Sequence, residues 1–290
     1  MSQFSTPAVS DGIYDASSLG RPRMFLLGLQ HLFAMFGATV LVPVLTGLSV
    51  SATLLFAGLG TLLFHFLSRG KVPAFLGSSF AFSAGYAAIA PNGEAELLPY
   101  ACLGVACAGL LYPVLAALFR AFGAKRVMRF FPPVVTGPIV ISIGLILASS
   151  AIANCQTNWL VAVVAVAVIV VCNIWGRGMV KIVPILLGVV VSYAVAAALG
   201  EVDFSGVAAA PWVGLPIVWD NTVFALFGPQ FDSGLATTAI ITIMPLAFAT
   251  MIEHIGDISA IGSTCERNYI ADPGLHRTLL GDGFATILAS

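Results

Sequence analysis

The chain has 290 residues, of which 59% are hydrophobic and 9% are charged, and its mean hydropathy is +1.01. This composition lies outside the range of soluble globular proteins and indicates a membrane protein. The net charge of −1 gives no indication of nucleic-acid binding, and the five cysteines, most of them in apolar surroundings, do not suggest a disulfide framework.

Apolar stretches near the length of about 20 residues that a helix needs to cross a bilayer recur along the chain. In chain order, the predicted spans cover residues 24–46, 50–68, 73–91, 97–122, 132–153, 159–175, 180–200 and 235–261. A ninth span begins near Thr278 but reaches only to Ser290, which is too short to cross a bilayer. We therefore expect an all-α polytopic membrane protein whose chain is truncated at its C-terminal end.

The basic residues are distributed unevenly among the connections between these spans. They occur before the first span and after the second, fourth, sixth and eighth, whereas the connections after the odd-numbered spans contain none. The positive-inside rule then places the N-terminus of this multi-pass protein in the cytoplasm. Acidic residues such as Glu94 and Asp203 lie in the connections assigned to the outside.

The third span is not expected to be a regular helix. It begins at Pro73 and continues through Gly77, Ser78 and Ser79 before its apolar part. Irregular backbone at membrane depth is tolerated where it lines a cavity, and such segments indicate the binding sites of transporters. The alternative is a helix of small residues that packs closely against its neighbours.

A weak internal repeat relates the start of the chain to its end. Gln-His at residues 30–31 corresponds to Glu-His at 253–254, and Gly-x-Gly at 58–60 corresponds to Gly-x-Gly at 281–283, with the same separation. Seven spans per repeat is an odd number, so the second copy would be inverted in the membrane, as in many transporters. A chance match is the alternative.

Glu253 and Asp257 are the two acids of the eighth span. A carboxylate in hydrocarbon costs about 2.5–3.5 kcal/mol even on insertion scales, so such residues usually face a cavity and have a function. Four residues apart, the two acids share a helix face, while His254 points about 100° away. Burial favours the uncharged form of a carboxyl group, so this face suits a proton-coupled site for a small polar ligand. A solvated helix end is the alternative.

Gln30 and His31 in the first span are further candidates, although hydrogen bonds to neighbouring helices would also explain them. The motif around Glu253 lacks the second histidine of a zinc protease, and the chain has neither a nucleophile elbow nor a phosphate-binding loop. An enzyme, a metal site and a cofactor are therefore not predicted, and a proton gradient is the expected energy source.

The chain resembles the nucleobase–ascorbate transporter family, and within it the bacterial uracil-permease type. Leu-Gln-His-Leu-Phe-Ala-Met-Phe-Gly-Ala-Thr-Val-Leu-Val-Pro-Val-Leu at residues 29–45 and Pro-Ala-Phe-Leu-Gly-Ser-Ser-Phe-Ala-Phe at 73–82 carry most of the resemblance. Glu-His-Ile-Gly-Asp at 253–257 and Asp-Pro-Gly-Leu-His-Arg at 272–277 complete it.

The resemblance implies two inverted repeats of seven spans, a short strand in span three, and proton-coupled uptake by alternating access in the bacterial plasma membrane, often as a homodimer. A cytoplasmic tail (1–23) would precede core-domain spans one to four (24–122) and gate-domain spans five to seven (123–200). An outer connection (201–233) and core-domain residues 234–290, with span eight and the incomplete span nine, would follow. Nucleic acid is not an expected partner.

The resemblance also assigns roles to single residues. Glu253 would hydrogen-bond the base, Phe80 would stack on it, and Ser79 and Ala38 would line the pocket. Gln30, His31 and Ser78 would support the site. Glu253 and Asp257 would carry the proton.

Two departures from the family pattern matter. Uracil-type members carry histidine at the position of Asp257, whereas purine-type members often carry an acid, so xanthine or another purine stays open beside the favoured uracil. The second substrate-binding acid of the family would lie beyond Ser290, so the fragment is not expected to transport alone. An anion transporter of the same architecture is a further alternative, but it would place a cation or a helix N-terminus at the pocket.

Overall fold

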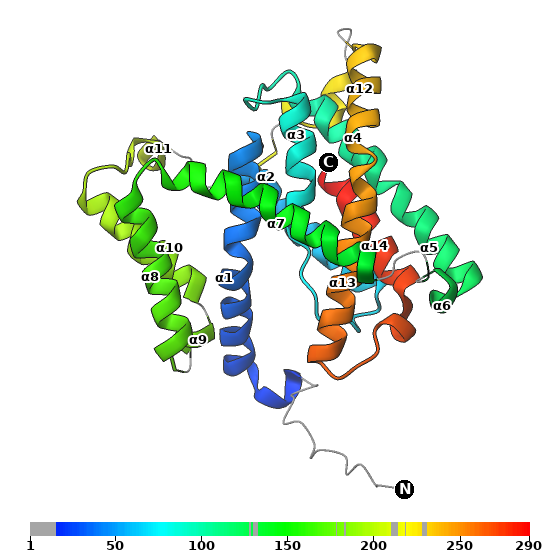
Figure 1. Cartoon of the computed structure of the whole chain (residues 1–290), viewed down its shortest axis with the longest axis horizontal. Coiled ribbons are helices and arrows are strands. Elements are labelled where there is room, and N and C mark those ends of the chain that lie inside the picture. Colours follow the sequence, from blue (N-terminus) through cyan, green and yellow to red (C-terminus); the bar gives the residue numbers. More distant parts are fainter. Residues whose placement is uncertain are drawn as a thin grey trace, which may run out of the picture.

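The computed structural model describes residues 16–127, 129, 133–177, 179–182, 184–209, 214–217, 219–227 and 231–290. Within these ranges, all regular elements are helices, as predicted (Figure 1). Three helical segments are long and apolar enough to cross a membrane: Val50–Leu67, Leu98–Phe122 and Ser233–Thr264. Shorter apolar helices cover Phe80–Ile89, Trp159–Trp175 and Pro184–Ala198. The described part of the chain is therefore consistent with a polytopic membrane protein.

The long helices follow the predicted spans. They are α1 (Arg21–Thr46), α2 (Val50–Leu67), α4 (Leu98–Gly109), α5 (Leu111–Phe122), α7 (Pro133–Cys155), α8 (Trp159–Trp175), α10 (Pro184–Ala198), α12 (Ser233–Ile243), α13 (Leu246–Thr264) and α14 (Leu275–Ala289). The short elements are η1 (Ala16–Leu19), η2 (Phe80–Phe82), α3 (Ser83–Ile89), α6 (Ala124–Val127), α9 (Met179–Ile182), α11 (Ser205–Ala209), η4 (Trp219–Asn221), η5 (Val223–Phe227) and η6 (Ile270–Gly274).

Polar side chains fix where several helices begin. Ser49 accepts a hydrogen bond from Ala52 N at 3.3 Å at the start of α2. Asn158 accepts from Leu160 N at 2.9 Å at the start of α8, and Asp232 accepts from Gly234 N at 2.7 Å at the start of α12. These side chains satisfy amide groups that have no partner within the first turn.

The predicted third span is irregular, but the expected strand is wrong for the described residues. Residues 73–79 are non-helical and lead into η2 and α3. A strand needs inter-strand hydrogen bonds, and the described part of the chain offers this segment no partner strand. Thr61 of α2 holds it instead: Leu76 N donates to Thr61 Oγ1 at 3.1 Å, and the same hydroxyl lies 3.3 Å from Leu76 O.

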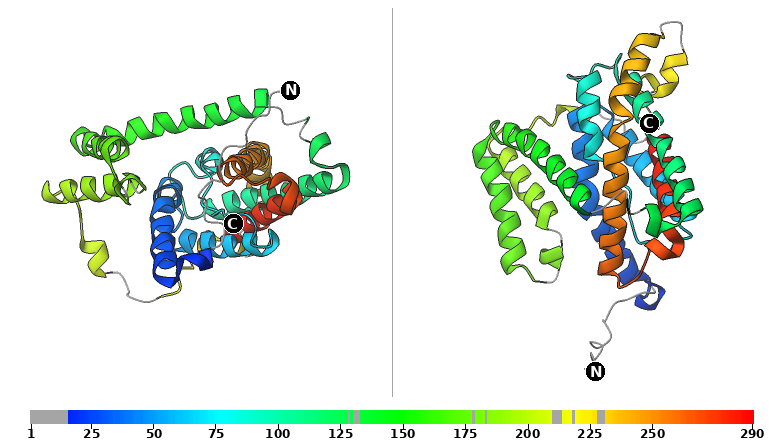
Figure 2. Two further views of the ribbon diagram at one scale, coloured as in Figure 1. Left: turned by 90° about the horizontal axis from the view of Figure 1, so that it is seen from below. Right: turned by 45° about the vertical axis from the view of Figure 1, so that its right-hand side comes forward.

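The helices lie in two groups (Figures 1 and 2). Helices α8 and α10 pack against each other to one side, where Gly188 of α10 approaches Ile169 of α8 closely. Helices α1 to α5 and α12 to α14 form the larger group, and α7 extends between the two. The predicted division into core and gate domains stays a prediction.

Helices α2 and α14 pack closely and run antiparallel. A Cβ atom added at Gly60 would lie 3.0 Å from Cβ of Ala285, and one added at Gly281 would lie 2.7 Å from Phe64. Further along, Arg277 Nη1 donates to Leu67 O at 3.3 Å. Residues later in α2 thus contact residues earlier in α14. Small residues at such an interface allow two backbones to approach each other.

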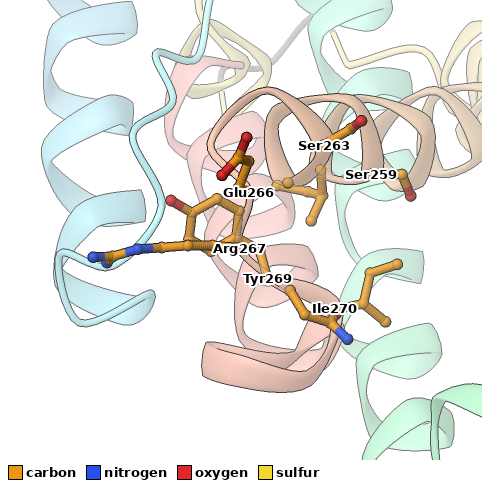
Figure 3. A pocket seen from close by; sticks show the side chains of 9 residues that line it. Ser259, Ser263, Glu266, Arg267, Tyr269 and Ile270 are labelled. Atoms are coloured by element: carbon orange, nitrogen blue, oxygen red, sulfur yellow. The ribbon is translucent and has the colours of Figure 1, made fainter. Parts of the chain in front are cut away.

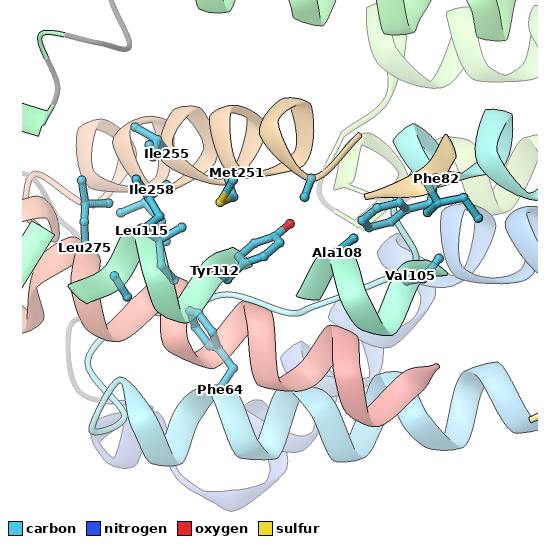
Figure 4. Close-up of a cluster of buried hydrophobic side chains, with 14 of the residues drawn as sticks. Phe64, Phe82, Val105, Ala108, Tyr112, Leu115, Met251, Ile255, Ile258 and Leu275 are labelled. Carbon is cyan, nitrogen blue, oxygen red and sulfur yellow. The ribbon is translucent and has the colours of Figure 1, made fainter. Parts of the chain in front are cut away.

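The buried core lies where α14 meets α2, α5 and α13 (Figure 4). Phe64, Tyr112, Met251 and Leu279 are almost fully buried there. Tyr112 is directed from α5 toward α13, and its hydroxyl lies 2.6 Å from Thr250 Oγ1. This hydrogen bond satisfies a buried polar group within an apolar contact, and it joins the fourth predicted span to the eighth.

The substitution Gly283→Ala tests this packing. An added methyl group would overlap Cβ of Tyr112 and lie 3.1 Å from Gly109 O, so α14 would have to move away from α5. We expect a loss of about 1–3 kcal/mol of stability, measured as a lower melting temperature of the purified protein in detergent. Gly58→Ala is the control, because a Cβ there meets nothing within 4 Å. Equal melting temperatures for the two variants would contradict the packing described.

Candidate functional site

The non-helical segment of the third span and the acid of the eighth span meet in the structure. Ser79 Oγ donates a hydrogen bond to Glu253 Oε2 at 3.4 Å, and both side chains are half-buried. These residues are 174 positions apart in the chain. The contact brings together two features that the sequence analysis assigned to one site on separate grounds.

Local structure holds Ser79 in this place. Its backbone is extended, with φ −85° and ψ 125°, and its hydroxyl accepts a hydrogen bond from Ala81 N at 3.3 Å at the start of η2. The following residue, Phe80, is half-buried, whereas Phe82 is buried in the core and anchors the short helix. Ser79 therefore both caps the start of η2 and bonds to Glu253.

Helix α1 lies on another side of the same segment. A Cβ atom at Gly77 would lie 3.0 Å from Thr39 Oγ1, so the segment approaches α1 as closely as glycine permits. His31 is exposed, and its ring lies edge-on to that of Phe75, with 6.3 Å between the centroids. The non-helical residues thus run between α1 and α13.

The remaining predicted residues lie near this contact to different degrees. Ser78 is half-buried beside Ser79. Asp257 is exposed, one turn after Glu253 on α13. Gln30 and Ala38 belong to α1, and their side chains lie outside the part of the chain that the structure describes. The structure thus brings Ser79 and Glu253 into direct contact, with Ser78 next to them, and leaves Asp257 facing away from the core.

The structure adds a pair that sequence reasoning missed. His254 Nδ1 lies 2.9 Å from Asp282 Oδ2 of α14, and the two side chains are 6% and 20% exposed. The other ring nitrogen, Nε2, is buried without a hydrogen-bond partner among the described residues, and Phe64 lies edge-on to the ring. Asp282, like Glu253, is an acid within an apolar stretch of the sequence, and this placement could have identified it.

Different faces of α13 therefore serve different contacts. Glu253 faces the non-helical segment, while His254 and Thr250 face the buried core, where they contact Asp282 and Tyr112. The predicted difference in direction between Glu253 and His254 is confirmed. The core-side contacts fix the rotation of the helix about its axis, and that rotation points Glu253 at Ser79.

The site is acidic. Glu253, Asp257 and Asp282 lie on two adjacent helices, and within the described residues no lysine or arginine forms a salt bridge with any of them. A site with these charges can accept hydrogen bonds from N–H groups and can bind protons. It would repel an anion, because like charges brought together in a poorly hydrated site cost free energy.

A separate cavity of about 350 Å³ lies at the far end of α13 (Figure 3). Its lining includes Ser259, Ser263, Glu266, Arg267 and Tyr269, which surround the turn that follows the helix. Neither Ser79 nor Glu253 lines it. The cavity lies at the end of the molecule that the sequence analysis assigned to the cytoplasm.

Comparisons with known proteins identify the family. The sequence model of the Permease family matches residues 22–290. The uracil permease of Bacillus caldolyticus is 40% identical over 287 residues, which cover 96% of this chain and 64% of that protein. The uracil permease of Bacillus subtilis strain 168 is 38% identical over 275 residues, covering 90% of this chain and 61% of that protein.

The uracil permease of Escherichia coli K12 is 37% identical over 274 residues, covering 91% of this chain and 60% of that protein. The chain thus spans less than two thirds of the length of each of these relatives. Their similarity extends over nearly all of this chain, including the segments around Ser79 and Glu253. The chain belongs to the Permease family, as its resemblance to nucleobase permeases predicted, and its apolar helices indicate a multi-pass plasma-membrane protein.

Proposed function

We propose that this chain takes part in the proton-coupled uptake of a nucleobase, with uracil favoured, across the bacterial plasma membrane. The observation that carries the proposal is the contact between Ser79 and Glu253 at 3.4 Å. It joins an interrupted span to a membrane-embedded acid, the combination that transporters use for binding. The names of the relatives, which are uracil permeases, support uracil as the substrate.

The binding site matches the chemistry of a pyrimidine ring. Uracil is planar and uncharged, with N–H donors and carbonyl acceptors on its edge. Glu253 accepts a hydrogen bond from a ring N–H, Ser79 contacts the same edge, and Phe80 stacks on the ring face. The family resemblance extends the proposal to Ala38 as a pocket residue and to Gln30, His31 and Ser78 as supporting residues. The bond between Ser79 and Glu253 is long at 3.4 Å, so a ligand can replace it at little cost.

The proton moves with the substrate. Desolvation as the site closes favours the neutral form of a carboxyl group, so a proton from outside binds to Glu253 or Asp257 together with the base. When the site opens to the cytoplasm, water enters, the carboxyl group loses its proton, and the base leaves. The proton gradient supplies the free energy, and the mechanism uses no cofactor.

The architecture proposed for the whole protein is two inverted seven-span repeats that work by alternating access. The antiparallel contact between α2 and α14 supports it, because these helices carry the two Gly-x-Gly motifs of the internal repeat. Elements related by a two-fold axis in the membrane plane would run in opposite directions. A cytoplasmic N-terminus and assembly as a homodimer belong to the same proposal.

The identity of the base depends on few residues. Asp257 favours a purine such as xanthine, since purine-type members often carry an acid there, whereas the similarity to uracil permeases favours uracil. An anion transporter is disfavoured, because the candidate site contains acids instead of a paired cation.

Glu253→Gln tests the binding role. The substitution keeps the shape of the side chain but removes its charge, and a hydrogen bond to a charged group contributes about 1.5–3 kcal/mol. We expect uptake of labelled uracil, by cells that express the gene encoding this chain, to fall about 10- to 100-fold at low substrate concentration. Glu96→Gln is the matched control, because Glu96 is exposed in a connection between helices. Unchanged uptake by the Glu253→Gln variant would refute the proposed site.

Asp257→Asn separates the proton step from binding. If Asp257 carries the proton, uracil accumulation driven by an acidic outer medium is lost, whereas exchange of internal for external uracil continues. Both can be measured in proteoliposomes with an imposed pH gradient, and Asp257→Glu should retain accumulation. If the Asn variant still accumulates uracil in response to the gradient, the proton is carried elsewhere, and Glu253 becomes the remaining candidate.

A further inference from the structure

A second cavity, of about 250 Å³, lies where the ends of three helices meet. Leu67 ends α2, Arg120 belongs to the last turn of α5, and His276 and Arg277 belong to the first turn of α14, with Leu280 one turn further. This is the end of the molecule that the positive-inside rule assigns to the cytoplasm. The cavity is distinct from the site at Glu253.

The polar lining of this cavity is basic. Arg120 and Arg277 carry guanidinium groups that remain charged at any physiological pH, His276 is also part of the lining, and no acid is among the lining residues. Arg277 is held in place by its hydrogen bond to Leu67 O at 3.3 Å. The side chain of Arg120 is exposed and forms no salt bridge within the described residues.

Among the described residues, no acid forms an ion pair with Arg120 or Arg277. Asp272 precedes α14, and both of its carboxylate oxygens lie 2.6 Å from Lys71 Nζ. Asp272 is the acid closest to His276 in the sequence, and its carboxylate is already paired with Lys71. Two guanidinium groups from different helices therefore converge on a cavity without a fixed counter-ion, an arrangement that suits a phosphate group, which guanidinium binds through paired hydrogen bonds.

The rest of the surroundings are apolar. Leu67 and Leu280 form the other walls. On α2, in the turns that lead to Leu67, Leu62 is 67% exposed and Phe66 is 80% exposed, which suits a helix surface in contact with lipid. The cavity thus combines cations at the level of the membrane surface with an apolar surface on the side of the bilayer.

We propose that this cavity binds the phosphate headgroup of an anionic phospholipid, with Arg120 and Arg277 on the phosphate and the acyl chains along α2. Basic pockets between membrane helices on the cytoplasmic side are suited to such headgroups. A bound lipid would join α2, α5 and α14, and so would stabilise the helix contacts that hold α13 in place. The proposal does not depend on which substrate is transported.

The test uses the purified chain in detergent, titrated with phosphatidylglycerol or with phosphatidylcholine. Bound lipid is counted by native mass spectrometry, and the melting temperature is followed in parallel. We expect phosphatidylglycerol to bind and raise the melting temperature more than phosphatidylcholine does. The variant Arg120→Gln should bind phosphatidylglycerol about fivefold more weakly, the effect of one basic residue near an anionic surface.

Arg126→Gln is the matched control, since Arg126 is exposed in α6 and does not line the cavity, and its affinity should not change. Arg120→Lys keeps the charge without the planar fork and should give an intermediate loss. Equal affinity of Arg120→Gln and Arg126→Gln, or equal binding of the two lipids, would overturn the proposal. A comparable rise in melting temperature with inorganic phosphate alone would overturn the assignment to a lipid.

Discussion

A non-helical segment within a membrane protein must find partners for its backbone polar groups, and this requirement organises the structure around residues 73–79. Leu76 bonds with Thr61 of α2 through both its N–H and its carbonyl group. Gly77 lies against Thr39 of α1, and Ser79 bonds with Glu253 of α13. Three helices from distant parts of the chain are therefore held around one short stretch. If this stretch were helical, the hydrogen bonds between the backbone of Leu76 and Thr61 would not be needed.

The same requirement explains why a ligand site can exist at this place. Glu253 has several lone pairs on its two oxygens, and its hydrogen bond from the described residues is the long one from Ser79. It therefore retains the capacity to accept bonds from a ligand. The core-facing side of α13 has shorter contacts, at 2.9 Å between His254 and Asp282 and 2.6 Å between Tyr112 and Thr250. One helix face is fixed to the core, and the other remains available.

Local sequence was sufficient to predict the helices and the break. The apolar stretch at 159–175 coincides with α8 (Trp159–Trp175), because asparagine before it and glycine after it mark its ends. Pro73 and Gly77 likewise predict the irregular third span. The eighth predicted span proves to be two helices, α12 and α13, and Pro245 between them is a signal that length and hydropathy alone do not register.

Contacts between distant segments could not be predicted in the same way. The contact between His254 and Asp282 depends on the packing of α14 against its neighbours, which hydropathy does not encode. The expected strand failed for a related reason, since it depends on a partner that the described residues do not supply.

The acidic and basic residues of the two candidate sites occupy different parts of the helices. Acids lie at mid-span on α13 and α14, whereas Arg120 and Arg277 lie at helix ends. A neutral base with a proton suits the first environment and an anionic headgroup suits the second, so the two proposed ligands would not compete for one site.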